Sequence, residues 1–196
     1  MTLPRPGILL DRDGTIIVDH GYVGSVDRVE FIPGAAQAIA SFNQAGVPVA
    51  VVTNQAGVAR GYYGLDDVAE VHQHIAEHLA AHQARIDMFV YCPYHPAGVI
   101  EAFARTSDDR KPGPGMAKAA QAALNLDLAA SWVVGDRPED MGLAKSIGAS
   151  GVYLGMLNGV SRPGVWPFPS LAAAAPFILG RLAATAGPFA LERVTS

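Results

Sequence analysis

Short apolar runs rich in β-branched residues alternate with stretches of helical periodicity along most of this chain, and this alternation limits its fold more than any other feature. The apolar runs have the length of strands, whereas the periodic stretches between them have the length of helices. Residues 47–52 are apolar almost throughout, as expected of a strand that is covered on both faces. The pattern therefore predicts an α/β fold built on a parallel sheet.

The boundaries of the expected elements follow from the apolar runs and from residues that begin or end helices. Pro33 and Gly34 are suited to the start of the first helix, and Gly46 is suited to its end. The expected strands are residues 8–10, 47–52, 89–91, 131–134 and 151–154. The expected helices are residues 34–43, 65–83, 114–124 and 138–147, with one more near 171–184.

Composition excludes several classes of protein. Half of the 196 residues are hydrophobic and 16% are charged, which suits a compact domain with a proper core. The net charge of −4 and the absence of a run of Lys and Arg argue against a nucleic-acid partner. The apolar stretch 171–180 is much shorter than a membrane span, so no membrane partner is expected.

The same observations predict the domain organisation and the compartment. Residues 1–157 are expected to form the main domain, and the Gly-, Pro- and Ala-rich residues 158–196 a C-terminal extension packed on or near its core. Cys92 is the only cysteine, so it excludes an internal disulfide and suits a reducing cytoplasm. We expect a monomer without a signal peptide.

Polar residues follow three of the expected strands at the point where each strand ends. Asp11 and Asp13 follow the first strand, Thr53 follows the second, and Asp136 follows the fourth. Ligands of open parallel sheets bind outside the carboxyl ends of the strands, so these side chains should gather around one point. Lys111, in a loop before a helix, could join them.

Such a cluster favours phosphoryl chemistry. Carboxylates packed together need a counter-ion, and hard oxygen ligands suit Mg²⁺, which often bridges carboxylate and phosphate. One carboxylate could attack phosphorus, and the second could protonate the leaving oxygen and later accept a proton from water. An Asp-x-Asp or a Gly-Asp is common in turns when it occurs alone. Their joint placement at successive strand ends makes a purely structural role a poor interpretation.

The motifs resemble those of the haloacid dehalogenase superfamily, in the same order along the chain. The resemblance rests on Asp11-Arg12-Asp13-Gly14-Thr15, Thr53, Lys111 and Gly135-Asp136-x-x-x-Asp140. It implies a Rossmann-like three-layer α/β sandwich with a mainly parallel sheet. Longer matches at residues 19–23, 53–61 and 110–116 resemble the branch of small phosphatases that act on heptose bisphosphates or histidinol phosphate. That branch has no large cap domain, which agrees with the short connections of this chain.

The resemblance also implies a role for each matching residue. Asp11 would be the nucleophile and Asp13 the acid/base, while Thr53 and Lys111 would stabilise the transferred phosphoryl group. Asp11, Asp136 and the backbone of Asp13 would hold Mg²⁺, with Arg137 beside them. The residues implied in substrate binding are Asp19, His20, Gly21, Tyr22, Thr53, Asn54, Gln55, Ala56, Arg110 and Lys111. The planar guanidinium of Arg110 suits a second phosphate or sugar hydroxyls.

One motif of many relatives is missing. Those proteins carry a loop that binds structural zinc through a Cys-x-His pair and a later Cys-x-Cys pair. Here Cys92 is present, but Tyr94 stands in the place of the histidine, and Ser107 and Asp109 in the places of the later cysteines. One thiolate does not make a tetrahedral site, so we expect no structural zinc. Packing of aromatic residues, including Tyr94 and Phe103, would have to hold the loop instead.

The function that follows is Mg²⁺-dependent hydrolysis of a small sugar phosphate through an aspartyl-phosphate, with the 7-phosphate of a heptose 1,7-bisphosphate as the first candidate. Histidinol phosphate or another small sugar phosphate is the alternative substrate. A non-catalytic sugar-phosphate-binding module is the alternative from another class. It is disfavoured because Asp11 and Asp13 are both present. Phosphoryl transfer to another hydroxyl is disfavoured because no large cap is expected to exclude water.

Overall fold

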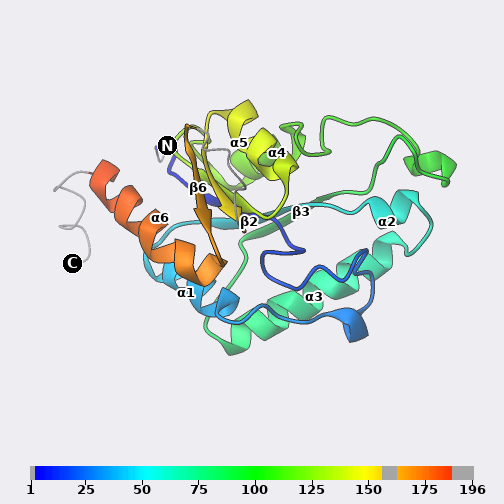
Figure 1. Ribbon diagram of the computed structural model, residues 1–196, viewed down its shortest axis with the longest axis horizontal. Coiled ribbons are helices and arrows are strands. Elements are labelled where there is room, and N and C mark those ends of the chain that lie inside the picture. The colour runs from blue at the N-terminus through cyan, green and yellow to red at the C-terminus, as the bar shows by residue number, and fades with distance from the viewer. Residues whose placement is uncertain (1–2, 156–162, 187–196) are drawn as a thin grey trace.

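A computed structural model describes residues 3–155 and 163–186, and its centre is a parallel sheet (Figure 1). The sheet has six strands in the order β3-β2-β1-β4-β5-β6. Their bounds are β1 Ile8–Leu10, β2 Val49–Asn54, β3 Met88–Cys92, β4 Trp132–Gly135, β5 Ser150–Leu154 and β6 Val165–Phe168. Every neighbouring pair runs parallel, which confirms the predicted fold class.

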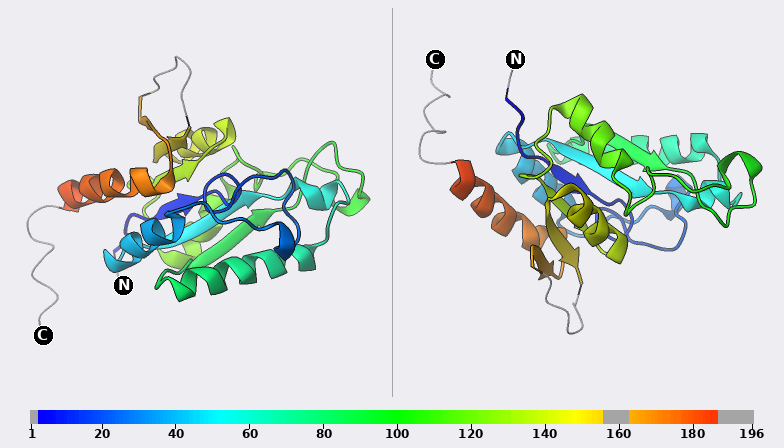
Figure 2. Two further views of the ribbon diagram at one scale, coloured as in Figure 1. Left: turned by 60° about the horizontal axis from the view of Figure 1, so that its bottom comes forward. Right: turned by 90° about the horizontal axis from the view of Figure 1, so that it is seen from above.

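Helices cover both faces of the sheet and make three layers (Figures 1 and 2). One face carries α1 (Ala35–Gln44), α3 (Leu65–Ala81) and α6 (Leu171–Ala186), and the other carries α4 (Gly115–Leu124) and α5 (Pro138–Ile147). Strand β1 shows why both faces are apolar. Its Ile8 and Leu10 belong to the core under the first set of helices, whereas Leu9 belongs to the core under the second. Successive side chains of a strand point to opposite faces, so a central strand must be apolar throughout.

No connection among the described residues carries more than a short helix, as expected of a fold without a large cap. The two longest described connections, residues 11–34 and 93–114, carry one short 3₁₀ helix each, at Val26–Arg28 and Glu101–Phe103. A single-turn helix, α2 (Ala56–Ala59), follows β2. Among the described residues, none of the helices combines the length and the apolar character that crossing a membrane requires.

The sequence did not predict β6, and it placed β2 two residues too early. Pro167 lies inside β6, and a proline within an apolar run argues against a strand. It is tolerated here because β6 is the edge strand of the sheet, so no further strand needs its missing N–H. For β2, the apolar run begins at Val47, but pairing with β1 and β3 begins only at Val49 and extends to Asn54.

Residues 163–186 share the sheet and core of the rest of the chain (Figure 2). Trp166 of β6 lies with its ring 5.2 Å from that of Trp132 in β4, and α6 buries Leu171 and Ile178 completely. The boundary expected at residue 157 falls among residues 156–162, outside the described part, and the division into two units stays a prediction.

Replacing Ile178 by Ala should test how far α6 contributes to the stability of the core. Because the side chain is fully buried, the substitution should lower the free energy of unfolding by about 2 to 5 kcal/mol, measured by urea denaturation. Ala173→Ser on the exposed side of the same helix is the control and should change it by less than about 0.5 kcal/mol. Equal effects of both substitutions would show that α6 does not share the main core.

Candidate active site

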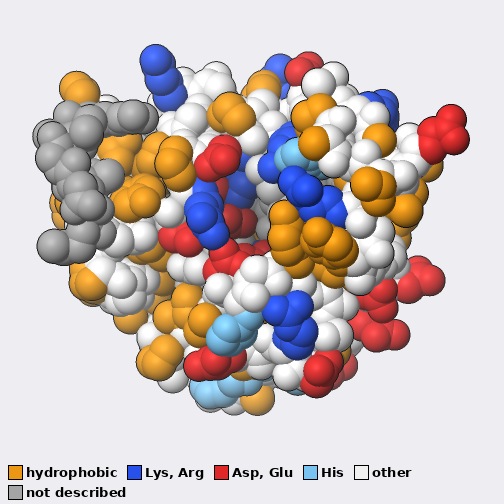
Figure 3. Space-filling model, turned by 45° about the vertical axis from the view of Figure 1, so that its right-hand side comes forward, with side chains coloured by type: hydrophobic (Ala, Val, Ile, Leu, Met, Phe, Trp, Pro, Cys, Tyr) orange, Lys and Arg blue, Asp and Glu red, His pale blue; other side chains and the backbone are white. Residues whose placement is uncertain are grey.

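The carboxyl ends of β1, β2 and β4 meet at one cleft. Leu10 of β1 lies opposite Val51 of β2 and Val134 of β4. Asp11, Thr53 and Asp136 each come one or two residues after this level, so they lie at the same edge of the sheet. The cleft has a volume of about 570 Å³, and acidic and basic side chains gather around the central hollow in Figure 3. The predicted residues that line it are Asp11, Asp13, Asp19, Gly21, Tyr22, Thr53, Asn54, Gln55, Ala56, Arg110, Lys111 and Arg137.

Lys111 is buried between two carboxylates. Its Nζ lies 2.9 Å from Oδ1 of Asp11 and donates to Oδ1 of Asp140 at 2.6 Å. Burial alone would lower the pKa of Lys111, but the two carboxylates outweigh it and raise the pKa, so the side chain is an ammonium ion. Asp140 also accepts the backbone N–H of Arg137 at 3.0 Å. Lys111 therefore joins the end of β1 to the start of α5.

The loop that carries Lys111 is held by Asn54, at the end of β2. The side-chain oxygen of Asn54 accepts the backbone N–H of Lys111 at 3.0 Å, and its amide nitrogen donates to the Lys111 carbonyl at 3.3 Å. Asn54 was predicted to bind substrate. In the structure, both polar atoms of the Asn54 side chain bind the backbone of Lys111, so the amide holds the loop.

A group of three carboxylates offers a place for a cation. Among the described residues, Asp11, Asp136 and Asp140 place one oxygen each within 4.8 Å of one another. Oδ1 of Asp136 is buried and has no hydrogen-bond partner in the described part of the chain. Burial and the nearby carboxylate of Asp11 raise the pKa of Asp136 to about 6. A buried carboxylate without a donor is what a divalent cation would satisfy, so this donor set fits Mg²⁺.

Gly14 allows this arrangement. Its φ of +78° favours glycine, and a Cβ there would lie 2.3 Å from Oδ2 of Asp136. The motif Asp11-Arg12-Asp13-Gly14-Thr15 therefore has glycine at position 14 because the Asp136 carboxylate occupies the space that a side chain there would need.

Asp13 is held by a buried guanidinium and an amide. Arg12 is fully buried and donates from Nε to Oδ2 of Asp13 and from Nη2 to Oδ1, both at 3.1 Å. Gln55 donates from Nε2 to Oδ2 of Asp13 and to Oγ1 of Thr53, both at 2.9 Å. Burial raises the pKa of Asp13, although Arg12 opposes this effect. The sequence assigned no role to Arg12, yet it is the nearest positive charge to Asp13.

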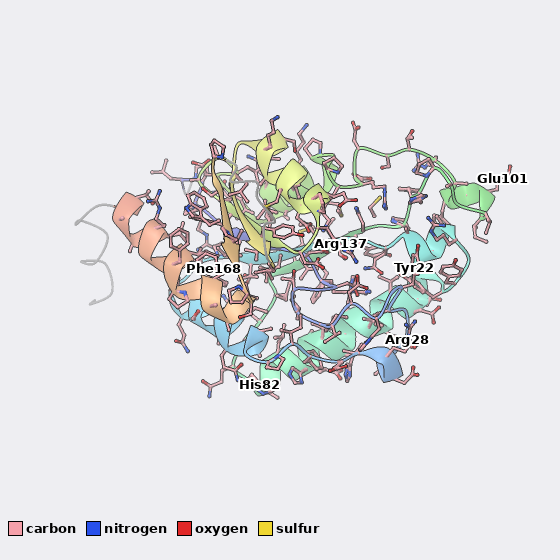
Figure 4. All side chains as sticks on the ribbon, viewed as in Figure 1. Tyr22, Arg28, His82, Glu101, Arg137 and Phe168 are labelled. Carbon is pink, nitrogen blue, oxygen red and sulfur yellow. The ribbon has the colours of Figure 1, made fainter. Side chains whose placement is uncertain are left out.

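The predicted substrate loop, residues 19–22, lies on one side of the cleft but not all of it faces inward. Arg137, labelled in Figure 4, forms an ion pair through Nη2 with Asp19, and its Nε lies 3.6 Å from Asp136. A guanidinium has no lone pair for a metal ion, so the Arg137 side chain accompanies the cation site without being a ligand. His20 pairs with Glu30 at 2.8 Å and does not line the cleft. Its predicted contact with substrate has no support in this geometry.

Several lining residues were not among the predicted site residues. They are Arg60, Tyr63, His95, Pro138 and Glu139. Arg60 belongs to the family match at residues 53–61, and the structure places it in the cleft wall. His95 comes from a loop far along the chain, so no local pattern could have placed it there.

The loop expected to lack zinc is packed through aromatic rings. The Tyr94 and Phe103 rings lie 6.0 Å apart, and the guanidinium of Arg105 lies 3.9 Å from the centre of the Tyr94 ring. Such a cation–π contact is attractive. The Cys92 thiol is buried and its sulfur donates to the Tyr94 carbonyl at 3.8 Å. The absence of zinc stays a prediction, and metal analysis of the purified protein tests it.

Comparison with known proteins places this arrangement in a family. The family model for HAD-hydrolase-like proteins matches residues 109–175. D-glycero-β-D-manno-heptose-1,7-bisphosphate 7-phosphatase of Yersinia pestis is 43% identical over 150 residues, which are 76% of this chain and 80% of the relative. The chain therefore belongs to the HAD-like phosphatases, a family of phosphoric monoester hydrolases.

Two crystal structures agree with this membership. A structure described as a HAD-like phosphatase from Mesorhizobium loti has a TM-score of 0.84 at 36% identity, covering 93% of this chain and 88% of the other. D,D-heptose 1,7-bisphosphate phosphatase of B. bronchiseptica, in complex with magnesium and phosphate, has a TM-score of 0.80 at 30% identity. That match covers 89% of this chain and 98% of the other.

Gly14→Ala should disturb the cation site without touching a ligand. The new Cβ would displace the Asp136 carboxylate, so Mg²⁺ affinity, measured by calorimetry, should fall about 10- to 100-fold. Gly46→Ala is the matched control, since Gly46 has a φ of +71° and open space around its Cβ position. It should carry a similar backbone strain but retain the Mg²⁺ affinity. Unchanged Mg²⁺ binding in Gly14→Ala would remove Asp136 from the site.

Proposed function

We propose that this chain removes the 7-phosphate of D-glycero-D-manno-heptose 1,7-bisphosphate through an aspartyl-phosphate on Asp11. The observation that carries the proposal is the placement of Asp11, Asp13, Thr53 and Lys111 around one cleft at the ends of parallel strands. The named substrate of the relative from Yersinia pestis supports the choice of sugar. We propose a monomer, since one chain supplies every group used below, and a cytoplasmic location, since a single cysteine suits a reducing compartment.

Asp11 is oriented for attack by its own contacts. Oδ1 accepts the backbone N–H of Arg12 at 2.8 Å and lies 2.9 Å from Nζ of Lys111. The other oxygen, Oδ2, is then the one that attacks phosphorus. The bond from phosphorus to the C7 oxygen breaks as the bond to Asp11 forms, and charge grows on the phosphoryl oxygens. Lys111 and Thr53 stabilise that charge.

Asp13 moves the proton in both halves of the reaction. Its Oδ2 accepts from both Arg12 and Gln55, so Oδ1 is the freer oxygen to carry a proton. Its raised pKa favours the protonated form that the first step needs. Asp13 gives this proton to the leaving C7 oxygen. Its carboxylate then takes a proton from the water that attacks the aspartyl-phosphate, which releases phosphate and restores Asp11.

Mg²⁺ would be held by Asp11, Asp136 and the backbone oxygen of Asp13, with Arg137 beside them. The orphaned Oδ1 of Asp136 supports this assignment. When bound, the ion neutralises charge on the phosphoryl group and on the surrounding carboxylates. Asp140 lies close to this set but would not be a ligand, because its Oδ1 accepts from Nζ of Lys111 and its Oδ2 accepts the backbone N–H of Arg137.

The part of the cleft lined by Arg110 and Arg60 suits the second phosphate. Nη1 of Arg110 and Nε of Arg60 are buried, and neither has a hydrogen-bond partner among the described residues. Both side chains line the cleft. Buried guanidinium N–H groups without acceptors are costly, and an anionic oxygen would satisfy them. A bisphosphate provides such an anion, whereas a simple aryl phosphate does not.

The first test is phosphate release from a panel of esters with Mg²⁺ or with EDTA. The panel contains both anomers of the heptose 1,7-bisphosphate, histidinol phosphate and p-nitrophenyl phosphate. We expect Mg²⁺-dependent turnover with a clear preference for one heptose anomer. A preference for histidinol phosphate would move the enzyme to the alternative substrate class. Activity on the aryl ester alone would retain the chemistry and reject the heptose.

Asp11→Asn and Asp13→Asn should separate the two carboxylate roles. Asp11→Asn should abolish turnover, because an amide is a poor nucleophile. Asp13→Asn should lower kcat about 10²- to 10⁴-fold while KM changes little, because only proton transfer is lost. Asp27→Asn is the control and should keep the wild-type kcat, because Asp27 is exposed on the 3₁₀ helix Val26–Arg28. Near-normal activity of either active-site variant in Mg²⁺ buffer would contradict the mechanism.

Arg110→Ala and Arg60→Ala should affect the bisphosphate selectively. Loss of one charge-assisted hydrogen bond should lower kcat/KM for the bisphosphate about 10- to 100-fold. The value for p-nitrophenyl phosphate should change less than about threefold, since that ester has no second phosphate. Arg85→Ala, at an exposed ion pair with Asp87, controls for the loss of positive charge. Equal losses on both esters would remove these arginines from a role in specificity.

A further inference from the structure

Tyr63 occupies a slot that the chain keeps open with two glycines. A Cβ on Gly24 would lie 2.0 Å from the Tyr63 ring, and a Cβ on Gly57 would lie 2.2 Å from it. Neither glycine has a positive φ that would by itself require glycine. The two glycines come from different segments, one after β1 and one in α2. The ring of Tyr63 lies between the two backbones and is therefore the physical reason why both positions need glycine.

The slot directs the Tyr63 hydroxyl at one acceptor. The hydroxyl donates to Oε1 of Gln55 at 2.8 Å, and Nη2 of Arg12 donates to the same oxygen at 3.0 Å. Two donors on this atom determine which way round the amide lies. With the amide reversed, its NH₂ group would face the Arg12 guanidinium and its oxygen would face the Asp13 carboxylate, and both contacts would be repulsive.

The other end of the amide supports two groups of the proposed mechanism. Nε2 of Gln55 donates to Oδ2 of Asp13 and to Oγ1 of Thr53, both at 2.9 Å. Because the Thr53 oxygen accepts a hydrogen bond from Gln55, the Thr53 hydroxyl is free to donate its own hydrogen to another acceptor. Gln55 is only 1% exposed, so its amide is fully engaged inside the protein. It is thus poorly placed to contact substrate, although it was predicted to do so.

We infer that Tyr63 is a positioning residue for the reaction, which holds the acid/base Asp13 in place through the Gln55 amide. The inference rests on the proposed function. A general acid contributes to the rate only when its proton is held within hydrogen-bond reach of the leaving oxygen. The supporting residues decide this alignment as much as the acid itself does.

The hydroxyl keeps its proton under all ordinary conditions. Burial raises the pKa of Tyr63 to about 12, although the nearby Arg12 opposes this effect. Tyr63 therefore remains a donor to Gln55 over the pH range in which the enzyme would be assayed.

Tyr63→Phe removes the hydroxyl and keeps the ring in its slot. A primary sugar phosphate needs the acid to protonate its leaving oxygen, whereas p-nitrophenolate leaves without that help. We expect kcat/KM for the heptose bisphosphate to fall about 3- to 10-fold, the effect of one neutral hydrogen bond. The value for p-nitrophenyl phosphate should fall less than about twofold. The kcat/KM ratio reports the first phosphoryl transfer, so slow hydrolysis of the aspartyl-phosphate does not obscure it.

Tyr62→Phe is the matched control, because Tyr62 is 61% exposed and takes no part in the hydrogen bonds of Gln55 described above. It should behave as wild type on both esters. Thermal melting of each variant separates a loss of fold from a loss of alignment. Equal losses of Tyr63→Phe on both esters, or no loss on the bisphosphate, would overturn the inference. A wild-type chain inactive on both esters would overturn the proposed function, and the inference with it.

A double-mutant cycle tests whether Tyr63 acts through Gln55. Gln55→Met removes the amide at nearly the same length and should show the same selectivity for the alkyl ester, with a larger loss. In the Gln55→Met background, adding Tyr63→Phe should change kcat/KM less than about twofold, because the residue it acts through is gone. Losses that multiply in the double variant would overturn the inferred route.

Discussion

The buried ammonium of Lys111, between Asp11 and Asp140, is the interaction on which the rest of the site depends. Two carboxylates this close to each other in a poorly solvated place repel unless a cation lies between them. The pair of contacts also joins three segments that are distant in sequence: the end of β1, the loop before α4 and the start of α5. Asn54 adds a fourth segment by holding the backbone of the same loop. Loss of one carboxylate would leave Lys111 with a single anionic partner, and loss of both would leave an uncompensated charge in the interior.

A second buried cation, Arg12, organises the other half of the site in the same way. It pairs with Asp13, donates to the carbonyl of Val23 at 2.6 Å and shares the Gln55 oxygen with Tyr63. Arg12 therefore connects the first motif to the segment after β1 and to the end of β2. Of the four carboxylates at the site, Asp11 and Asp140 contact Lys111, and Asp13 pairs with Arg12. Asp136 has the longer contact of 3.6 Å with Nε of Arg137, and its buried Oδ1 has no hydrogen-bond partner among the described residues, which is why this position suits a metal ion.

The walls of the cleft come from the two longest connections and from the segment that includes α2. None of these segments contains a long helix or a strand that packs as part of a layer, so each is held by a few specific contacts to the sheet or to another loop. The loop after β3 relies on the stacking of Arg105 on Tyr94 and on the contact with Phe103. These contacts lie in the loop that was expected to lack zinc, and the same loop carries Arg110, which lines the cleft. Nε of Arg60 and Nη1 of Arg110 are buried beside the cleft and have no acceptor in the described part of the chain.

The sequence by itself determined the parallel α/β fold, because apolar periodicity is a local property. It also determined the identity of the chemical groups, which belong to recognisable motifs: Asp11, Asp13, Thr53, Lys111 and Asp136. It could not decide β6, whose Pro167 is acceptable only at the edge of a completed sheet. Nor could it separate side chains that face the cleft from those that support it. His20 turns to Glu30, the Asn54 and Gln55 amides bind within the protein, and Arg60 and Tyr63 enter the wall. These outcomes depend on which partners lie across the cleft, and residues far apart in the chain become neighbours only when the sheet has assembled.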